Sequence, residues 1–322
     1  MSDLTDFFPA ASGGGGGGYI PGLIGVEYLA LSGGGAGGRQ SGTYGGGGAG
    51  GGTLAYQYVY LNLDVTTPVL VGAGGAVAGL SDQVDGGSTV LGEGLLLHVQ
   101  TILGGGGGTY NTSLIQNFGT CAGGRGSIDS NTAGAQTGNG FDGRGRIIGL
   151  LSEESVKASL KNINDTTIPY SNSNTAGFSG PGGGGLGGNA ANGAYNNGTI
   201  GGIGLNPNTI TDRFLTQAEF ISEGIGEVTS SVAYIGGGGS GYRATGRANP
   251  PGGCGAANTS ALAYTGGGGG AGPTGGNGGS GFAMLRIATS QSVTTTGTVS
   301  TYTKGNDTVY VWKGTGSITL NS

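Results

Sequence analysis

The sequence predicts a mainly β protein in which short strands are combined with packed polyglycine-II helices in an elongated, glycine-rich sandwich. Three observations favour this fold class. The 322 residues include 83 glycines, many of them in uninterrupted runs such as Gly104–Gly108 and Gly266–Gly270. Apolar segments of strand length precede several of these runs. Only 9% of the residues are charged and the mean hydropathy is −0.02, which argues against a disordered chain.

The glycine runs need a partner for every backbone polar group. Glycine loses more conformational freedom on ordering than any other residue, so an ordered run has to be held by many neighbours. Collagen is excluded because there are only 9 prolines and no glycine at every third position. A polyglycine-II run makes no internal hydrogen bonds, and neighbouring runs would have to satisfy its N–H and C=O groups. Side chains are then expected only on outer faces and in loops.

Residues 1–18 are expected to be a docking peptide followed by a glycine linker. The peptide is polar except for the apolar candidates for docking, Phe7, Phe8 and Pro9, and the linker is Gly13–Gly18. The N-terminus is acidic and lacks the basic residues and apolar core of a secretory signal. We therefore expect assembly in a cytoplasm, without membrane insertion.

Residues 19–290 are expected to form the glycine-rich body, with a polar insertion at about 111–228. Short strands are predicted at Val26–Leu31, Leu54–Leu63, Leu95–Leu103, Ser231–Ile235 and Ala261–Thr265. The insertion contains two predicted amphipathic helices. One is capped by Ser152 and carries Val156, Leu160 and Ile163 on one face; the other starts at Thr211, carries Phe214, Ala218 and Ile221, and stops at Gly224.

Residues 291–322 are expected to form a C-terminal β segment. Thr301–Trp312 is typical of a hairpin that turns at Lys304–Asp307, and Ser317–Leu320 of a further strand.

The composition offers little for catalysis. His98 is the only histidine, and because it lies within an apolar segment we expect a structural role for it. No metal ligand set, cofactor motif or nucleophile context is evident, so we expect no enzyme and no cofactor. A net charge of −5 argues against nucleic acid as a partner. Cys121 and Cys254 are too few for a disulfide framework, and buried thiols are favoured over a bridge between them.

Binding chemistry is better represented than catalysis. Tyrosine is the commonest aromatic residue, with 14 copies against 8 phenylalanines and 1 tryptophan. Tyrosine among serine, glycine and asparagine is typical of loops that recognise ligands by stacking and adaptable hydrogen bonding, although the same residues also simply fill turns. The receptor-binding candidates are Tyr110, Asn111, Tyr170, Asn172, Tyr195, Asn196, Asn197, Tyr242, Arg243 and Arg247.

Four segments taken in order resemble the glycine-rich domain of tailed-bacteriophage tail-fibre and adhesin proteins. They are Val26–Gly38, Val69–Gly75, Gly278–Ile287 and Tyr310–Ile318. The resemblance implies a virion structural protein in a host-facing position, assembled in the host cytoplasm, with loops that read a surface receptor such as a saccharide. It also implies that the N-terminus binds other virion proteins. A homo-oligomer, for example a trimer, is compatible with this role.

The alternative is a head or tail decoration protein that binds only other virion proteins. A secreted glycine-rich matrix protein would require the signal peptide that this N-terminus does not resemble.

Overall fold

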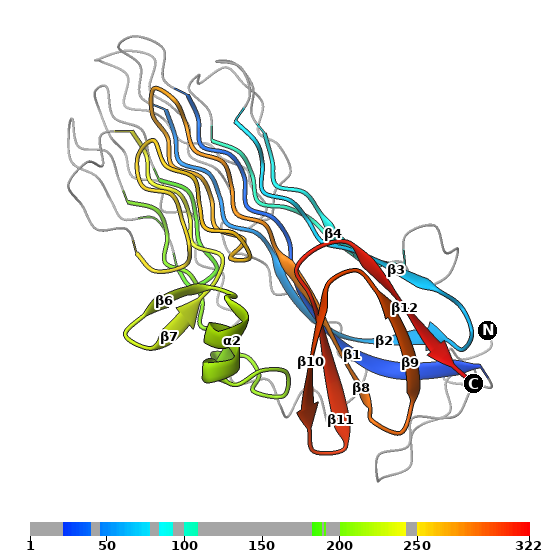
Figure 1. The fold of residues 1–322 in the computed structure, drawn as a ribbon. Coiled ribbons are helices and arrows are strands. Elements are labelled where there is room, and N and C mark those ends of the chain that lie inside the picture. Colours follow the sequence, from blue (N-terminus) through cyan, green and yellow to red (C-terminus); the bar gives the residue numbers. More distant parts are fainter. Residues whose placement is uncertain are drawn as a thin grey trace, which may run out of the picture.

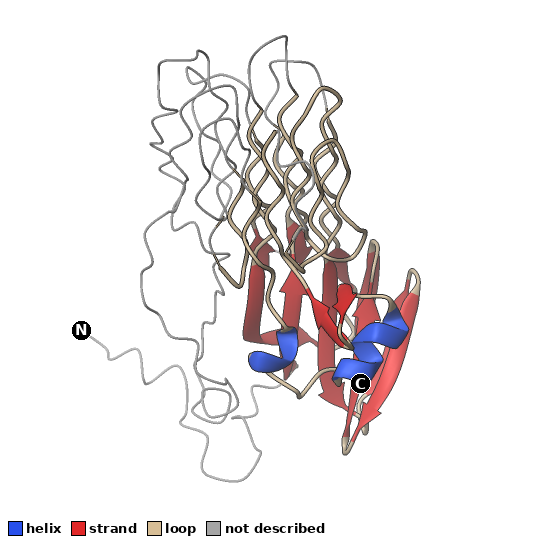
Figure 2. Cartoon of the chain, turned by 90° about the vertical axis from the view of Figure 1, so that its left-hand side faces the viewer, coloured by secondary structure: helices blue, strands red, loops and turns tan. Residues whose placement is uncertain are grey.

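The computed structural model describes residues 22–39, 46–77, 84–92, 100–108, 182–188, 190, 200–242 and 250–322. Figure 1 shows two β-sheets at one end of the molecule and a block of glycine-rich segments that extends from the strands toward the other end. Figure 2 shows the same division: the glycine-rich segments have no regular strand or helix assignment, and the strands and helices lie below them.

The first sheet has five antiparallel strands in the order β10-β11-β8-β1-β2. The strand β1 pairs on one side with the edge strand β2 and on the other with the central strand β8, so that segments from both ends of the chain lie together. The strands are β1 (Leu23–Leu31), β2 (Leu54–Asn62), β8 (Phe282–Ala288), β10 (Val299–Lys304) and β11 (Asp307–Trp312).

The second sheet also has five antiparallel strands, in the order β5-β4-β3-β12-β9. Its strands are β3 (Thr67–Leu70), β4 (Thr89–Leu91), β5 (Gln100–Ile102), β9 (Ser292–Thr296) and β12 (Gly316–Asn321). A separate hairpin pairs β6 (Glu227–Thr229) with β7 (Val232–Tyr234).

The described part of the chain has two hydrophobic clusters, one on each face of the first sheet. Alternation along β1 sends Val26 and Tyr28 to one face and Leu29 and Leu31 to the other. The first cluster fills the space between the two sheets and includes the fully buried Trp312. The second joins the first sheet to the 3-10 helix η2 (Pro207–Thr209), the helix α2 (Gln217–Glu223) and their neighbours.

The glycine-rich segments are buried and bonded to one another through their backbones. Along residues 33–38 the N–H donors reach three neighbouring segments in turn, and each neighbour is reached again three residues later. Gly33 and Ala36 donate to the carbonyls of Gly87 and Val84, Gly34 and Gly37 to those of Gly279 and Gly276, and Gly35 and Gly38 to those of Gly50 and Gly47, at 2.8–3.0 Å. These neighbours run antiparallel. A parallel pair occurs where Gly268 and Ala271 donate to Gly237 and Ser240.

The structure confirms a mainly β chain with a C-terminal group of strands. The predicted hairpin forms, because Lys304 pairs with Asp307 across the turn, and the predicted strand at Ser317–Leu320 is part of β12. The predictions for Val26–Leu31, Leu54–Leu63 and Ser231–Ile235 correspond to β1, β2 and β7. The strand predicted at Leu95–Leu103 is described only from residue 100 onward, and this part contains β5.

Two sequence predictions are wrong. Ala261–Thr265 is not a strand: Tyr264 has a φ of 59°, a left-handed conformation that breaks an extended segment, and Thr265 Oγ1 donates to the carbonyl of Leu262. The second helix does not start at Thr211. Thr216 caps it instead, and it ends at Gly224 as predicted, with a φ of 70° at that glycine. The helix predicted at Ser152, and also His98, lie outside the described residues.

Candidate functional site

Several described segments end close together at the end of the glycine block that is farthest from the sheets. Arg39 forms a β-bridge with Gly272, Gly108 donates to the carbonyl of Ala36, and the N–H of Tyr242 donates to the carbonyl of Gly46 at 3.0 Å. We call this end of the block the distal end. It is one of two regions where the described residues suggest function.

Tyr242 is the receptor-binding candidate that the structure describes, and it lies at the distal end. It is half-buried, and its backbone is fixed by the bond to Gly46. The other receptor-binding candidates lie outside the described residues: Tyr110, Asn111, Tyr170, Asn172, Tyr195, Asn196, Asn197, Arg243 and Arg247. The docking candidates Phe7, Phe8 and Pro9 also lie outside them.

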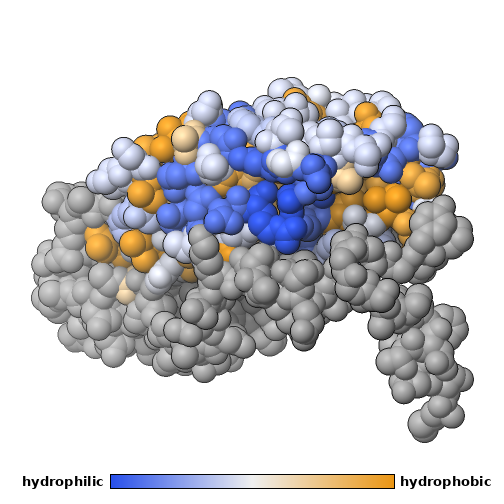
Figure 3. Space-filling view, turned by 90° about the horizontal axis from the view of Figure 1, so that it is seen from below, coloured by the Kyte–Doolittle hydropathy of each residue, from blue (hydrophilic) through white to orange (hydrophobic). Residues whose placement is uncertain are grey.

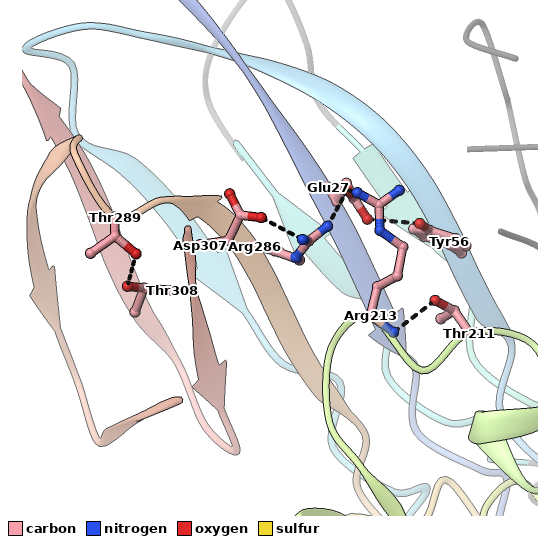
Figure 4. Close-up of polar contacts among 8 residues, drawn as sticks. All are labelled: Glu27, Tyr56, Thr211, Arg213, Arg286, Thr289, Asp307 and Thr308. Atoms are coloured by element: carbon pink, nitrogen blue, oxygen red, sulfur yellow. Dashed lines mark hydrogen bonds and ion pairs between the residues drawn. The ribbon is translucent and has the colours of Figure 1, made fainter. Parts of the chain in front are cut away.

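The second region is a cluster of charged side chains on the first sheet, which we call the Glu27 cluster. Glu27 on β1 lies between two guanidinium groups: its Oε1 is 2.7 Å from Arg286 Nη1 and 2.5 Å from Arg213 Nη2. The hydroxyl of Tyr56 donates to Glu27 Oε2 at 2.7 Å. Arg286 also pairs with Asp307 on β11. Figure 4 shows these side chains converging from the four neighbouring strands β11, β8, β1 and β2 and from the segment that follows η2.

The register of the sheet explains this convergence. Glu27 is paired directly with Arg286 across β1 and β8, and with Tyr58 across β1 and β2. Arg213 comes from outside the sheet, and its backbone N–H donates to Thr211 Oγ1 at 3.2 Å. The side chain of Glu27 is 9% exposed, so its charge is largely removed from water and needs these partners. The cluster therefore fastens the 207–215 segment to the sheet.

Helix α2 is fastened to β10 in a similar way. Thr216 and Glu219 form a reciprocal capping box at its N-terminus, and Glu219 also pairs with Lys304. At the other end Glu223 accepts hydrogen bonds from Ser300 Oγ at 2.7 Å and from Tyr302 Oη, and it lies 3.0 Å from Lys313 Nζ.

These contacts shift the pKa values of the groups involved. Burial alone would raise the pKa of Glu223, but hydrogen bonds from Tyr302, Ser300 and Lys313 lower it below its ordinary value. The pKa of Glu219 is lowered for the same kind of reason: burial opposes the shift, and Lys304 and Thr216 outweigh it. Burial and the bond to Glu223 raise the pKa of Tyr302 to about 12. Both carboxylates are thus stabilised in their charged form.

The charged side chains have structural partners rather than a reactive arrangement. Figure 3 shows hydrophilic residues gathered near the centre of the face seen from below. Each carboxylate of the Glu27 cluster and of the α2 contact has a cationic partner. In the part of the chain that the structure describes, no group of three His, Cys, Asp or Glu residues could hold a metal ion.

Cys254 follows two glycines whose backbone N–H groups bind the carboxylate of Glu227. The N–H groups of Gly252 and Gly253 both donate to Glu227 Oε2 at 2.8 Å, which ties β6 to the glycine block. Cys254 is half-buried, and its Sγ donates to the carbonyl of Pro250 at 3.2 Å. Burial, assisted by the charge of Glu227, raises the pKa of this thiol to about 12. Cys121 lies outside the described residues.

The sequence analysis did not single out the Glu27 cluster. Glu27 and Arg286 are each a single charge within an apolar strand, Val26–Leu31 and Phe282–Ala288 respectively. A buried charge is seldom tolerated without an opposite charge, so an ion pair between Glu27 and Arg286 could have been predicted from the sequence.

The described residues include no helix that is both long enough and apolar enough to cross a membrane. Two sheets, a short helix and a block of backbone-bonded glycine segments define a glycine-rich β protein. The chain matches the family described as glycine-rich domain over residues 20–288, and it belongs to that family. No curated protein and no solved structure matches the chain.

Proposed function

We propose that the glycine block is a bundle of packed polyglycine-II helices. The support is the period of its hydrogen bonds: in residues 33–38 the donors return to the same neighbour after three residues, and polyglycine II has three residues per turn. The close approach of the segments also fits. A Cβ atom built on Gly35 or Gly268 would overlap with the carbonyl groups of a neighbouring segment, so these positions accept only glycine.

We further propose that this bundle is the rigid scaffold of a phage virion protein, a tail-fibre or adhesin subunit that contributes to recognition of a host receptor such as a surface glycan. The observation that carries this proposal is the distal end, where the chain leaves the described block after Arg39, Val77, Gly108 and Tyr242. Binding residues are commonly placed on loops that a rigid scaffold positions. The resemblance of Val26–Gly38 to phage adhesin sequences supports the same class.

A decoration protein that binds only virion partners is the second candidate. It is favoured by the internal pairing of the charged groups on the β end, which leaves structure rather than recognition as their evident role. The two candidates differ in which residues matter: those that follow the distal end for an adhesin, and those that contact the particle for a decoration protein.

Adsorption measurements on mutant particles test the adhesin proposal. Replacing Tyr242 and Arg243, or Tyr195, Asn196 and Asn197, with alanine should lower the adsorption rate to host cells and leave particle yield and the melting temperature almost unchanged, because truncation of surface residues usually changes stability by less than about 0.5 kcal/mol. The matched control is Thr301→Ala, an exposed position on β10 at the opposite end. Normal adsorption of every one of these alanine variants, with defects confined to particle assembly, would favour the decoration protein.

A truncation tests the proposed docking peptide. Burial of Phe7 and Phe8 in a virion partner would contribute about 1.5–3 kcal/mol each. Removal of residues 1–12 should therefore give a folded protein that no longer joins particles. Incorporation at the wild-type level would refute the docking role.

A further inference from the structure

Among the described residues, the strand β9 is the last strand at one edge of the second sheet. Its register partner in the described structure is β12 on one side. Its five residues, Ser292–Thr296, include no proline, glycine or charged residue, and they alternate between exposed and half-buried. Exposed edge strands can pair with another chain, and proteins usually guard them with charges, prolines, bulges or short length. None of these devices is present in β9.

The backbone groups that β9 directs outward can be assigned from the bonds of β12. Asp64 N–H donates to the carbonyl of Leu320 at 2.7 Å, so the backbone of Leu320 faces away from β9. The backbone N–H and C=O groups of successive residues in a strand point alternately to its two sides, so those of Thr319 and Asn321 point toward β9. Their register partners Thr294 and Ser292 must face back toward β12. The N–H and C=O groups of the two intervening residues, Val293 and Thr295, then point away from the sheet.

These two residues are placed symmetrically about Thr294. We propose that a second copy of this chain pairs antiparallel with β9 about a two-fold axis at Thr294. In this arrangement Val293 of each copy lies opposite Thr295 of the other copy. The N–H and C=O groups of these two residues, four groups on each strand, are then all used in four intermolecular hydrogen bonds. The inference does not depend on the receptor or on the place of the protein in a particle.

The side chains are compatible with this pairing. Thr294 would meet Thr294 of the second copy, and Ser292 would meet Thr296; cross-strand pairs of hydroxyl residues are favourable, and no like charges face each other. The outer surface of the sheet is already ordered by hydroxyl contacts: Thr296 bonds Ser317 at 2.8 Å, and Asn321 Nδ2 bonds Thr294 Oγ1 at 3.1 Å. Two five-stranded sheets would thus become one continuous sheet.

Two other edge strands are less suited to self-pairing. The strand β5, at the opposite edge of the same sheet, has three residues. The strand β10, at an edge of the first sheet, ends in the charged Lys304, and its Ser300, Tyr302 and Lys304 side chains are held by α2. The β9 contact itself is small compared with a standard interface of about 1,600 Å². We therefore expect a concentration-dependent dimer that is favoured where copies are held near one another.

Sedimentation equilibrium of the full chain over a concentration series tests the proposal. The wild-type protein should change from monomer to dimer as its concentration rises. T294K should reduce the association constant at least tenfold, because the two introduced charges would face each other across the axis. The matched control T319K adds the same charge to the same sheet face one strand inward, on β12, and should leave the association constant within about twofold of wild type, since a surface substitution changes free energies by less than about 0.5 kcal/mol.

Mixing experiments separate this contact from misfolding and from other partners. T294K and T294E, each monomeric alone, should form a heterodimer when mixed. T295P should remain folded, because proline is tolerated where an edge N–H points outward, but it should lose the dimer. A monomer at every concentration, a dimer that T294K does not weaken, or a mixture that fails to associate would overturn the proposal.

Discussion

At the scale of single residues, the glycines of the block are fixed by what surrounds them. A Cβ atom on Gly268 would overlap with the carbonyl of Ala49, a backbone group that cannot rotate away. Gly314, by contrast, is exposed and has open space around its Cβ position. The same substitution to alanine should therefore be strongly destabilising at Gly268 and nearly neutral at Gly314.

We expect Gly268→Ala to lower the free energy of unfolding by about 3 kcal/mol or more, at the upper end of overpacking effects. Gly314→Ala should change it by less than about 0.5 kcal/mol. Chemical denaturation of both variants measures the difference. Equal stability of the two variants would show that the glycine segments do not approach as closely as described.

The Glu27 cluster gives a second prediction at this scale. Glu27→Ala leaves the guanidinium groups of Arg286 and Arg213 without their shared carboxylate, and breaking a buried pair in this way costs about 3–5 kcal/mol. Arg213→Ala should cost less, because its side chain is 31% exposed against 14% for Arg286. A double-mutant cycle on Glu27 and Arg213 measures their coupling. Additive effects of the two substitutions would contradict the role assigned to Arg213.

At the scale of elements, the attachment of α2 should depend on pH. The pKa of Glu223 is lowered in the folded protein, so the folded state binds protons less readily than the unfolded chain. This contribution to stability is fully present above the unfolded-state pKa of about 4.3, and it is lost as the pH falls through the lower folded-state pKa.

Glu223→Gln should therefore destabilise the protein at pH 7 by about 1.5–3 kcal/mol, the range for hydrogen bonds to charged groups. Below pH 4 the difference from wild type should shrink, because the wild-type carboxyl is then protonated as well. Thermal unfolding at a series of pH values tests this, with Ser222→Ala, an exposed position on the same helix, as the control. A destabilisation that persists unchanged at acid pH would show that the charge of Glu223 is unimportant.

The elements also show how far the sequence predicts this structure. The strand β1 was predictable because its apolar run leads into glycines, and β2 was predictable from the alternation along Leu54–Leu63. The C-terminus of α2 was predictable from Gly224, but its start was not, because Thr211 and Thr216 are both acceptable caps. Glu219, three residues after Thr216, was the stronger signal, since the two form a capping box. Ala261–Thr265 has strand-like composition, and only its tertiary contacts explain the turn at Tyr264.

The candidate site was less predictable than the strands. Glu27 and Arg286 are 259 positions apart in the sequence, and only the strand order and register bring them together. Tyr242 was predicted as a binding residue from composition, and its place at the distal end follows from hydrogen bonds between glycine segments that no side-chain pattern specifies.

At the scale of the whole molecule, the glycine block and the β-sheets are one continuous structure. The strands β1, β2 and β8 run directly into the segments 32–38, 46–53 and 275–281, and these segments are bonded to each other. Opening one glycine segment would break bonds to several neighbours that are distant in sequence. The block should therefore open only with the sheets, although its backbone has the largest entropy to gain.

Hydrogen exchange tests this cooperativity directly. The amides of Gly33–Gly38 and Gly266–Gly270 are buried, and the donors among them reach neighbouring carbonyls at 2.8–3.0 Å, so we expect them to exchange as slowly as those of β1 and β8. Gly305 and Asn306, in the exposed turn between β10 and β11, should exchange rapidly and serve as the internal control. If the glycine amides exchanged as fast as this turn while β1 and β8 stayed protected, the block would be a separate and weakly ordered unit. The proposed scaffold for receptor recognition would then lose its rigidity.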